Sequence, residues 1–281
     1  MRWRETEGRA TEIRLIVSDI DGTLLPRGGR ISDVTRRAVE RCWARGIPFV
    51  LATGRWAGAI GEVRRDLGLE NRPCIIANGG AVLDGDGSCL REWHMREADA
   101  RRAAAIAREY PVLINSYVRN GLYRLNVTPT LRRLQMYVGE GNPRIVQNDP
   151  AAFDSEGMRN VYKLEVLCEN PSVLAELSAR VRKLGLSVSS ASPRNVEIMA
   201  PGCGKGTALR WLAGHLGAPR ETVMAFGDHY NDLELLEEAG WPVAMGNSVN
   251  ALKDAARIVA PACVEDGVAR VLFERVLEEE P

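Results

Sequence analysis

Short runs of apolar residues alternate along the chain with longer segments in which apolar residues recur at helical spacing. At 13–17 the apolar residues do not alternate with polar ones, which is typical of a strand buried on both faces of a parallel sheet. Ser32 can cap a helix that stops at Gly46. The next predicted elements are a strand at 47–52, a helix at 56–67, a strand at 74–77 and a short returning strand at 81–84. These β-α-β units predict an α/β protein with a doubly wound, mainly parallel, Rossmann-like sheet.

The pattern changes character at about residue 84. Helices are then predicted at 96–110, 129–140 and 171–183, and antiparallel strands at 112–125, 163–167 and 186–199. An α+β unit of this kind inside a parallel pattern suggests an inserted cap domain. The parallel pattern resumes with a strand at 196–200, a helix at 205–216 and a strand at 222–228. The expected domains are a polar tail at 1–11, a core at 12–83 and 196–281, and the cap at 84–195.

Composition narrows the class of protein. The chain has 281 residues, 45% hydrophobic and 26% charged, which is ordinary for a globular protein of one large or two modest domains. Because 37 basic residues balance 37 acidic ones, we expect neither nucleic acid nor a membrane surface as a partner. No apolar run reaches the length of a membrane span, and the polar N-terminus does not resemble a signal peptide. We therefore expect a cytoplasmic protein with free thiols.

Two aspartates follow the first predicted strand and form the leading candidate site. Residues i and i+2 of an extended strand point to one side, roughly 6.5 Å apart, so Asp19 and Asp21 can face one small ligand. Gly22 allows a sharp turn, and Thr23 adds a hydroxyl. In open α/β sheets ligands bind beyond the carboxyl ends of the strands. One carboxylate could attack phosphorus while the other donates a proton to the leaving oxygen, although turns also use Asp and Gly for their geometry.

Two further segments carry candidate phosphate-binding groups. Thr53-Gly54-Arg55 ends the second strand, where a phosphate could bind the Thr53 hydroxyl and a backbone N–H near Gly54. Lys205 opens a predicted helix, where a cation is unfavourable to the helix dipole unless an acidic group lies nearby. A compact ammonium there can lie between Asp19, Asp228 and a phosphoryl oxygen. Taken alone, the first segment would more often be an ordinary helix start.

Asp228 and Asp232 stand four residues apart across a predicted strand-to-helix turn. One carboxylate can reach a cation while the other holds the loop or the waters of the cation. Magnesium takes six oxygen ligands, and Asp19, a backbone carbonyl near Asp21, Asp228 and a phosphate oxygen would form a suitable set. Asp and Asn also cap helices, so this segment alone does not establish a metal site.

Taken together, the motifs resemble one known family. They are Asp19-Ile-Asp-Gly-Thr-Leu24, Thr53-Gly-Arg55, Asn78-Gly-Gly80, Lys205-Gly206, Gly227-Asp-x-x-Asn-Asp232, Met245-Gly-Asn247 and Glu265-Asp-Gly-Val-Ala269. Their order and spacing resemble the haloacid dehalogenase (HAD) superfamily, and in particular its Cof-type phosphatases with a type IIB cap. The resemblance covers about 12–275, and the linked set is specific where each motif alone is not.

The resemblance implies a role for each catalytic residue. Asp19 would be the nucleophile that becomes aspartyl phosphate. Asp21 would be the general acid and base, with its backbone carbonyl on Mg²⁺. Thr53 and Lys205 would hold the phosphoryl oxygens, and Lys205 would also balance the acidic cluster.

The same resemblance implies the remaining metal and substrate contacts. Asp228 would be the other metal ligand, and Asp232 would support it. Asn231 would contact the phosphate or the substrate. Arg55 and Asn78 would line the floor beneath the cap, while Met245-Gly-Asn247 would be structural.

The leading hypothesis is a Mg²⁺-dependent phosphatase that hydrolyses a small phosphorylated metabolite, such as a sugar phosphate or a phosphoglycolate-like ester. One alternative is a phosphomutase on the same core. A less favoured alternative is a phospho-accepting receiver-type switch, which is only about one ordinary domain long and has no reason for an inserted cap. The sequence does not name the substrate, since sugar phosphates, phosphoglycolate, phosphorylated flavin precursors and pyridoxal phosphate remain open, and it does not indicate an oligomeric state.

Overall fold

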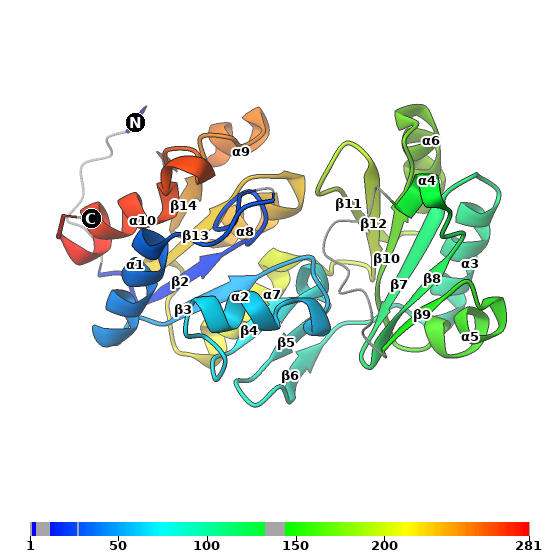
Figure 1. Cartoon of the computed structure of the whole chain (residues 1–281), viewed down its shortest axis with the longest axis horizontal. Helices are drawn as coiled ribbons and strands as arrows, with labels where there is room; N and C mark the ends of the chain where they lie inside the picture. The colour runs from blue at the N-terminus through cyan, green and yellow to red at the C-terminus, as the bar shows by residue number, and fades with distance from the viewer. Residues whose placement is uncertain (1, 4–11, 27, 133–143, 281) are drawn as a thin grey trace.

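A computed structural model describes residues 2–3, 12–26, 28–132 and 144–280, which form two β-sheets with helices packed against them. Figure 1 shows the two sheets side by side along the long axis of the molecule. The first sheet has nine strands, in the order β1 (Arg2–Trp3), β15 (Ile258–Val259), β14 (Trp241–Ala244), β13 (Val223–Gly227), β2 (Leu15–Ser18), β3 (Phe49–Ala52), β4 (Cys74–Ile76), β5 (Ala81–Leu83) and β6 (Cys89–Glu92). Its order confirms the predicted doubly wound α/β class.

Strand β2 lies at the centre of this sheet, between β13 and β3, and runs parallel to both. Its residues are buried on both faces, as the lack of alternation predicts. Ile16 packs on the side of α1 (Asp33–Ala44) and α10 (Gly267–Leu272), whereas Leu15 and Val17 pack on the side of α7 (Lys205–His215). Pairing is antiparallel only at the margins, between β1 and β15, β4 and β5, and β5 and β6.

The local signals at the first helix act as predicted. The Ser32 side chain accepts a hydrogen bond from the Thr35 backbone N–H, and the chain leaves α1 through Gly46 at φ 75°.

The predicted helix at 56–67 is wrong in its first turn. Trp56 stays extended, a 3₁₀ turn (Ala57–Ala59) follows, and α2 begins only at Gly61 and ends at Asp66. The Trp56 indole lies against Gly58, so a side chain there would collide with it.

The second sheet has six strands, in the order β11 (Ser187–Ser189), β12 (Asn195–Met199), β10 (Val161–Leu167), β7 (Leu113–Val118), β8 (Gly121–Leu125) and β9 (Ile145–Gln147). Among the described strands of this sheet, only β8 and β9 pair in parallel. Helices α3 (Glu97–Arg108) and α6 (Pro171–Arg182) cover one face, where Leu164, Val166 and Leu177 are buried. The opposite face carries polar residues that lie side by side across the strands, with Glu165 between Asn115 and Glu197.

Two strands lie on a different side of the expected boundaries at 84 and 195. Strand β6 pairs with β5 and extends the nine-stranded sheet, so the chain leaves that sheet after Glu92. Strand β12 was expected to begin the returning core, which is wrong, because it pairs antiparallel with both β10 and β11 in the six-stranded sheet. All five residues of β12 are buried. Its sequence therefore resembles that of a strand of the nine-stranded sheet, although it belongs to the six-stranded sheet.

Several other elements differ from the predicted pattern. The helix predicted at 129–140 is described only as α4 (Pro129–Arg132), and 133–143 lie outside the described residues. Within the predicted tail, Arg2–Trp3 pair with β15, and 4–11 lie outside the described residues. Strand β9 and helix α5 (Pro150–Ser155) were not predicted. Among the described helices, none combines the length and apolar character that a bilayer span requires.

Candidate active site

The candidate site lies where β2, β3 and β13 end at one edge of the nine-stranded sheet. In the parallel ladders Ser18 stands opposite Leu51 of β3 and opposite Phe226 of β13, so the residues after each strand meet. The Asp19 backbone N–H donates to the Phe226 carbonyl at 3.0 Å, which extends the ladder by one bond. This register places Asp19 beside the loop that starts at Asp228.

The turn after Asp19 depends on one glycine. Gly22 has φ 87°, and a Cβ there would overlap the carboxylate of Asp228. The Asn247 side-chain amide donates to the Gly22 carbonyl at 2.8 Å, and the Thr23 hydroxyl donates to Asp228 Oδ1 at 3.3 Å. Asn247, expected to be structural, thus fixes the turn that carries Asp21.

Lys205, the first residue of α7, holds two aspartates together. Its Nζ lies 2.5 Å from Asp19 Oδ1 and 2.6 Å from Asp232 Oδ1, and its side chain is fully buried. The acidic partner that its position at a helix start predicts is therefore present. Its ammonium contacts Asp19 and Asp232, whereas Asp228 was expected beside Asp19. Its Nζ thus bridges Asp19 and Asp232.

Three carboxylates could hold a metal ion. Asp19, Asp228 and Asp232 each offer an oxygen, and these oxygens lie within 4.8 Å of one another. The second oxygen of Asp232 accepts from the backbone N–H groups of Asp228 and His229, at 3.0 and 3.2 Å. Because both Asp232 oxygens already have partners, Asp232 is better suited to support the cluster, whereas Asp19 and Asp228 are better suited to ligate an ion. The Asp21 side chain is outside this group.

Burial and mutual repulsion shape the charges of the cluster. Burial raises the pKa of Asp19 well above its usual range, and the neighbouring aspartates raise it further against the opposing effect of Lys205. Burial, followed by repulsion from Asp232, raises the pKa of Asp228 to about 7. Burial lowers the pKa of Lys205, but attraction to Asp19 and Asp232 outweighs this and leaves the pKa raised. Such an acidic cluster is arranged to receive positive charge.

Arg55 and Asp21 form an ion pair at the mouth of the site. Arg55 Nε and Nη2 lie 2.8 and 2.5 Å from the two carboxylate oxygens of Asp21, and Nη1 donates to the Ala59 carbonyl at 3.2 Å. The Arg55 backbone N–H donates to the buried Thr53 hydroxyl oxygen at 3.1 Å. The predicted segment Thr53-Gly54-Arg55 is thus folded against the Asp21 turn.

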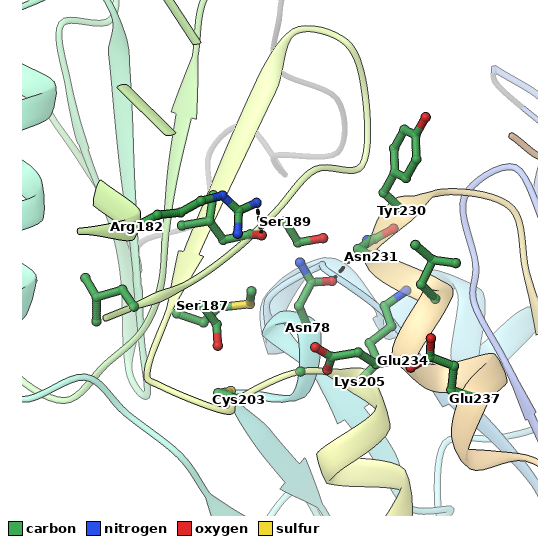
Figure 2. A pocket seen from close by; sticks show the side chains of 15 residues that line it. Asn78, Arg182, Ser187, Ser189, Cys203, Lys205, Tyr230, Asn231, Glu234 and Glu237 are labelled. Atoms are coloured by element: carbon green, nitrogen blue, oxygen red, sulfur yellow. Dashed lines mark hydrogen bonds between the residues drawn. The ribbon is translucent and has the colours of Figure 1, made fainter. Parts of the chain in front are cut away.

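Asn78 and Asn231 also meet at the site. Asn78 adopts a left-handed conformation, with φ 56°, and is buried. The Asn231 side-chain nitrogen donates to Asn78 Oδ1 at 3.2 Å. Both residues line a cavity of about 480 Å³ that is shared by Lys205 and by strand β11 of the six-stranded sheet (Figure 2).

Two charged residues at the junction of the sheets were not expected from the sequence. Lys163 and Glu197 are both buried in the six-stranded sheet, and Lys163 Nζ lies 2.7 Å from Glu197 Oε1. Lys163 Nζ also donates to the Gly54 carbonyl at 2.8 Å. A signal existed, because a charged residue inside an otherwise apolar strand requires a partner, and the chain has only four lysines.

Comparisons with known proteins give the family. A family model described as haloacid dehalogenase-like hydrolase matches residues 16–272. A Bacillus subtilis (strain 168) protein named 5-amino-6-(5-phospho-D-ribitylamino)uracil phosphatase YcsE is 28% identical over 267 residues, covering 95% of this chain and 97% of that protein. The crystal structure of a haloacid dehalogenase-like hydrolase from Bacteroides thetaiotaomicron has a TM-score of 0.80 at 26% identity, covering 94% of this chain and 99% of that chain. A solved HAD subclass IIB sugar phosphatase, BT4131, has a TM-score of 0.81 at 21% identity, covering 93% and 98%, and shows the fold alone.

The fold and the buried acid–lysine site are therefore those of a hydrolase with a doubly wound, Rossmann-like core and a second, six-stranded sheet. The chain belongs to the haloacid dehalogenase-like hydrolase family. The resemblance to Cof-type HAD phosphatases is confirmed, and so is the assignment as a phosphatase.

Proposed function

We propose that the protein is a Mg²⁺-dependent phosphatase that hydrolyses a small phosphorylated metabolite through an aspartyl-phosphate intermediate. The observation that carries the proposal is the contact of Lys205 Nζ with Asp19 Oδ1 inside a group of three carboxylates at the carboxyl edge of the sheet. A strand-end carboxylate beside a buried cation is suited to attack a phosphoryl group whose negative charge that cation balances.

The donor set fits a hard divalent cation, since the three side chains that could hold it are all carboxylates. Asp19, Asp228 and the backbone carbonyl of Asp21 would hold Mg²⁺, and Asp232 would support them. When bound, the ion neutralises the acidic cluster and draws negative charge from the phosphoryl oxygens.

The residues of the chain divide the chemistry into two steps. In the first, an Asp19 carboxylate oxygen attacks phosphorus, the bond from phosphorus to the ester oxygen breaks, and protonated Asp21 gives its proton to that oxygen. In the second, the Asp21 carboxylate takes a proton from water, which attacks the aspartyl phosphate. Inorganic phosphate leaves and the Asp19 carboxylate is restored. Lys205, the Thr53 hydroxyl and a backbone N–H near Gly54 bind the phosphoryl oxygens in both steps.

The six-stranded sheet is proposed to act as the cap that selects the leaving group. Asn78 and Asn231 line the cavity in Figure 2, together with Lys205 of the acid cluster and strand β11 of this sheet. The substrate is proposed to be a sugar phosphate or a similar small ester, and the protein to work in the cytoplasm. A phosphomutase on the same core remains the alternative, and formation of hexose 6-phosphate from hexose 1-phosphate would favour it.

The test compares the wild type with Asp19→Asn. We expect the wild type to release phosphate from p-nitrophenyl phosphate with Mg²⁺ and to lose this activity in EDTA. The variant should retain its fold, because Asn is nearly isosteric and relieves acid crowding, but it should not turn over. A variant that keeps more than a few per cent of the wild-type rate would show that Asp19 is not the nucleophile. Circular dichroism of both proteins is the folding control.

A further inference from the structure

The segment 53–55, proposed above to bind phosphate, is held by groups from both sheets. The Thr53 carbonyl accepts a hydrogen bond at 2.9 Å from the backbone N–H of Asn78, in the loop after β4. The carbonyl of the next residue, Gly54, instead accepts from Lys163 Nζ at 2.8 Å, and Lys163 belongs to β10 of the six-stranded sheet. One peptide group of the segment is therefore oriented by a side chain of the other sheet.

This peptide group, between Gly54 and Arg55, makes a hydrogen bond at each end. Its carbonyl accepts from Lys163, and its N–H donates to the Thr53 hydroxyl oxygen at 3.1 Å. Because a peptide group is planar, a cation that fixes the carbonyl also fixes the direction of the N–H. The positive charge polarises the group and strengthens the second hydrogen bond. Lys163 thus acts on the Thr53 hydroxyl through a single peptide group.

The Thr53 hydroxyl is the group proposed to bind a phosphoryl oxygen. Thr53 is 1% exposed, so its neighbours rather than solvent decide where the hydroxyl proton is offered. The N–H of Arg55 occupies a lone pair of the hydroxyl oxygen and leaves the proton available for a ligand. A donor that is already fixed in place loses less entropy when phosphate binds.

The ammonium group of Lys163 is itself firmly placed. Its Nζ lies 2.7 Å from Glu197 Oε1, and both side chains are buried. The centroid of the Tyr117 ring lies 4.4 Å from the same Nζ. An ammonium has three hydrogens, and Gly54, Glu197 and Tyr117 offer three partners. A buried ion pair often stabilises a fold no better than apolar side chains would, which favours a role of this pair beyond stability.

Gly54 permits the close approach of the lysine. A Cβ at Gly54 would stand 3.3 Å from Lys163 Nζ and 2.9 Å from Asn78 Oδ1, and the second distance is too short for a Cβ. Just beyond the segment, Trp56 packs in one buried cluster with Tyr117 of β7. The six-stranded sheet therefore anchors this loop at two points, a carbonyl and an indole ring.

We propose that Lys163 is a positioning residue for phosphate binding. By orienting the Gly54–Arg55 peptide, it holds the Thr53 hydroxyl ready to donate to a phosphoryl oxygen. Glu197 keeps Lys163 in place and balances its charge. The proposal rests on the phosphatase function proposed above. It gives a residue of the six-stranded sheet an effect on phosphate affinity that does not depend on the leaving group.

The test measures the binding of inorganic phosphate, which has no leaving group, by calorimetry with Mg²⁺. Lys163→Met keeps a long side chain without a donor, and we expect it to raise the Kd for phosphate by about 10-fold. The kcat/KM for p-nitrophenyl phosphate should fall by a similar factor. A purely structural role would lower the fraction of molecules that bind, and hence the stoichiometry, without changing the Kd. An unchanged Kd would therefore overturn the proposal.

Arg119→Met is the matched control, because Arg119 also joins the two sheets. Its Nη2 lies 2.5 Å from an oxygen of Glu92, which belongs to β6 and not to the segment 53–55. Because this ion pair is largely exposed, its loss should change the Kd for phosphate by less than about 2-fold. An equal increase in Lys163→Met and Arg119→Met would show that general contact between the sheets decides phosphate affinity, against the proposal.

A double-mutant cycle tests whether Lys163 acts through Thr53. Thr53→Val removes the hydroxyl and should itself weaken phosphate binding. In this background Lys163→Met should raise the Kd by less than about 2-fold, because the group it positions is gone. An increase of the same size with and without the hydroxyl would contradict the proposed route.

A second variant covers a failure to fold. If Lys163→Met does not fold because Glu197 loses its counter-charge, Lys163→Met/Glu197→Gln removes both charges and should show the same increase in Kd. A wild type that binds phosphate but does not hydrolyse p-nitrophenyl phosphate with Mg²⁺ contradicts the phosphatase function, while the Kd values still decide the role of Lys163. A wild type that hydrolyses the ester, with one Kd for all folded variants of Lys163, contradicts this role alone.

Discussion

Arg55 binds both carboxylate oxygens of Asp21, with Nε 2.8 Å from Oδ2 and Nη2 2.5 Å from Oδ1. The guanidinium therefore occupies both carboxylate oxygens of Asp21. Under the proposed mechanism, Arg55 must therefore turn from Asp21 toward the substrate before the ester oxygen can be protonated. The ion pair thus couples substrate binding to the ability of Asp21 to protonate the ester oxygen.

Replacing Asp21 by Asn should slow the enzyme in a way that depends on the leaving group. A general acid contributes about 10²- to 10⁴-fold in rate, and an alkoxide leaving group requires it far more than p-nitrophenolate does. We expect a large loss of kcat on an alkyl phosphate and a smaller loss on p-nitrophenyl phosphate. Steady-state kinetics on both esters measure this difference. Equal losses would exclude the acid role.

Replacing Lys205 by Arg should abolish most activity although the charge is kept. The ammonium is fully buried and is already within 2.6 Å of two carboxylates, so a wider planar guanidinium would displace the phosphate or the acids. The loss of one positioned electrostatic partner lowers kcat by about 10²- to 10³-fold. Lys183→Arg, at an exposed position, is the matched control. Near-normal turnover and phosphate affinity in Lys205→Arg would show that only diffuse charge is needed.

Two glycine substitutions separate backbone strain from damage to the metal site. Gly22 and Gly28 both have positive φ, at 87° and 69°, so alanine strains the backbone at each position. Only at Gly22 would the new Cβ overlap Asp228, whereas at Gly28 it meets nothing within 4 Å. We expect Gly22→Ala to lose Mg²⁺ binding, measured by calorimetry, and Gly28→Ala to keep it. Similar Mg²⁺ affinities in the two variants would contradict the proposed metal site.

The stability of the metal-free protein should fall with pH because of the acid cluster. The pKa of Asp228 is raised from 3.8 to about 7, so between these values the folded protein keeps a proton that the unfolded chain has lost. The free energy of unfolding therefore decreases as pH rises through this window. Asp228→Asn lacks this effect, so in EDTA the Tm of the variant minus that of the wild type should grow from pH 4 to pH 8.

Magnesium should oppose the loss of stability with rising pH in the wild type but not in Asp228→Asn. Because metal binding releases protons from its ligands, the Tm increase on adding Mg²⁺ should be larger at pH 8 than at pH 5. Thermal melts at the two pH values, with and without the ion, measure this increase. An increase that is the same at both values, or one that persists in Asp228→Asn, would argue against the cluster as the binding site.

The sequence predicts the part of the site that depends on strand ends. Asp19, Thr53 and Asp228 each follow an apolar run, and the carboxyl ends of neighbouring parallel strands must meet at one edge. The position of Lys205 at a helix start, unfavourable to the dipole, also indicates its acidic partners. Local sequence patterns are sufficient here, because a parallel sheet brings the carboxyl ends of its neighbouring strands together even when they are far apart in the sequence.

The contacts between the two sheets could not be predicted in this way. Lys163 meets the Gly54 carbonyl from 109 positions away, and no local pattern records this contact. Strand β12 was assigned to the wrong sheet because a fully buried strand has the same apolar character in either sheet. The partner of Lys205 was mistaken for a similar reason, since Asp228 and Asp232 lie on one turn and only the fold decides which faces the ammonium.

Asp19 and Lys205 are 186 positions apart. Strand β2 lies between β3, which is synthesised soon after it, and β13, which is synthesised much later. During synthesis β3 can pair with β2 soon after both emerge, but the other edge of β2 has no partner until 223–227 are complete. An apolar strand with an open edge is prone to associate with other chains. A chain that is released before residue 223 is therefore expected to aggregate readily. It is also expected to be inactive, because it lacks β13 and the aspartates that follow this strand.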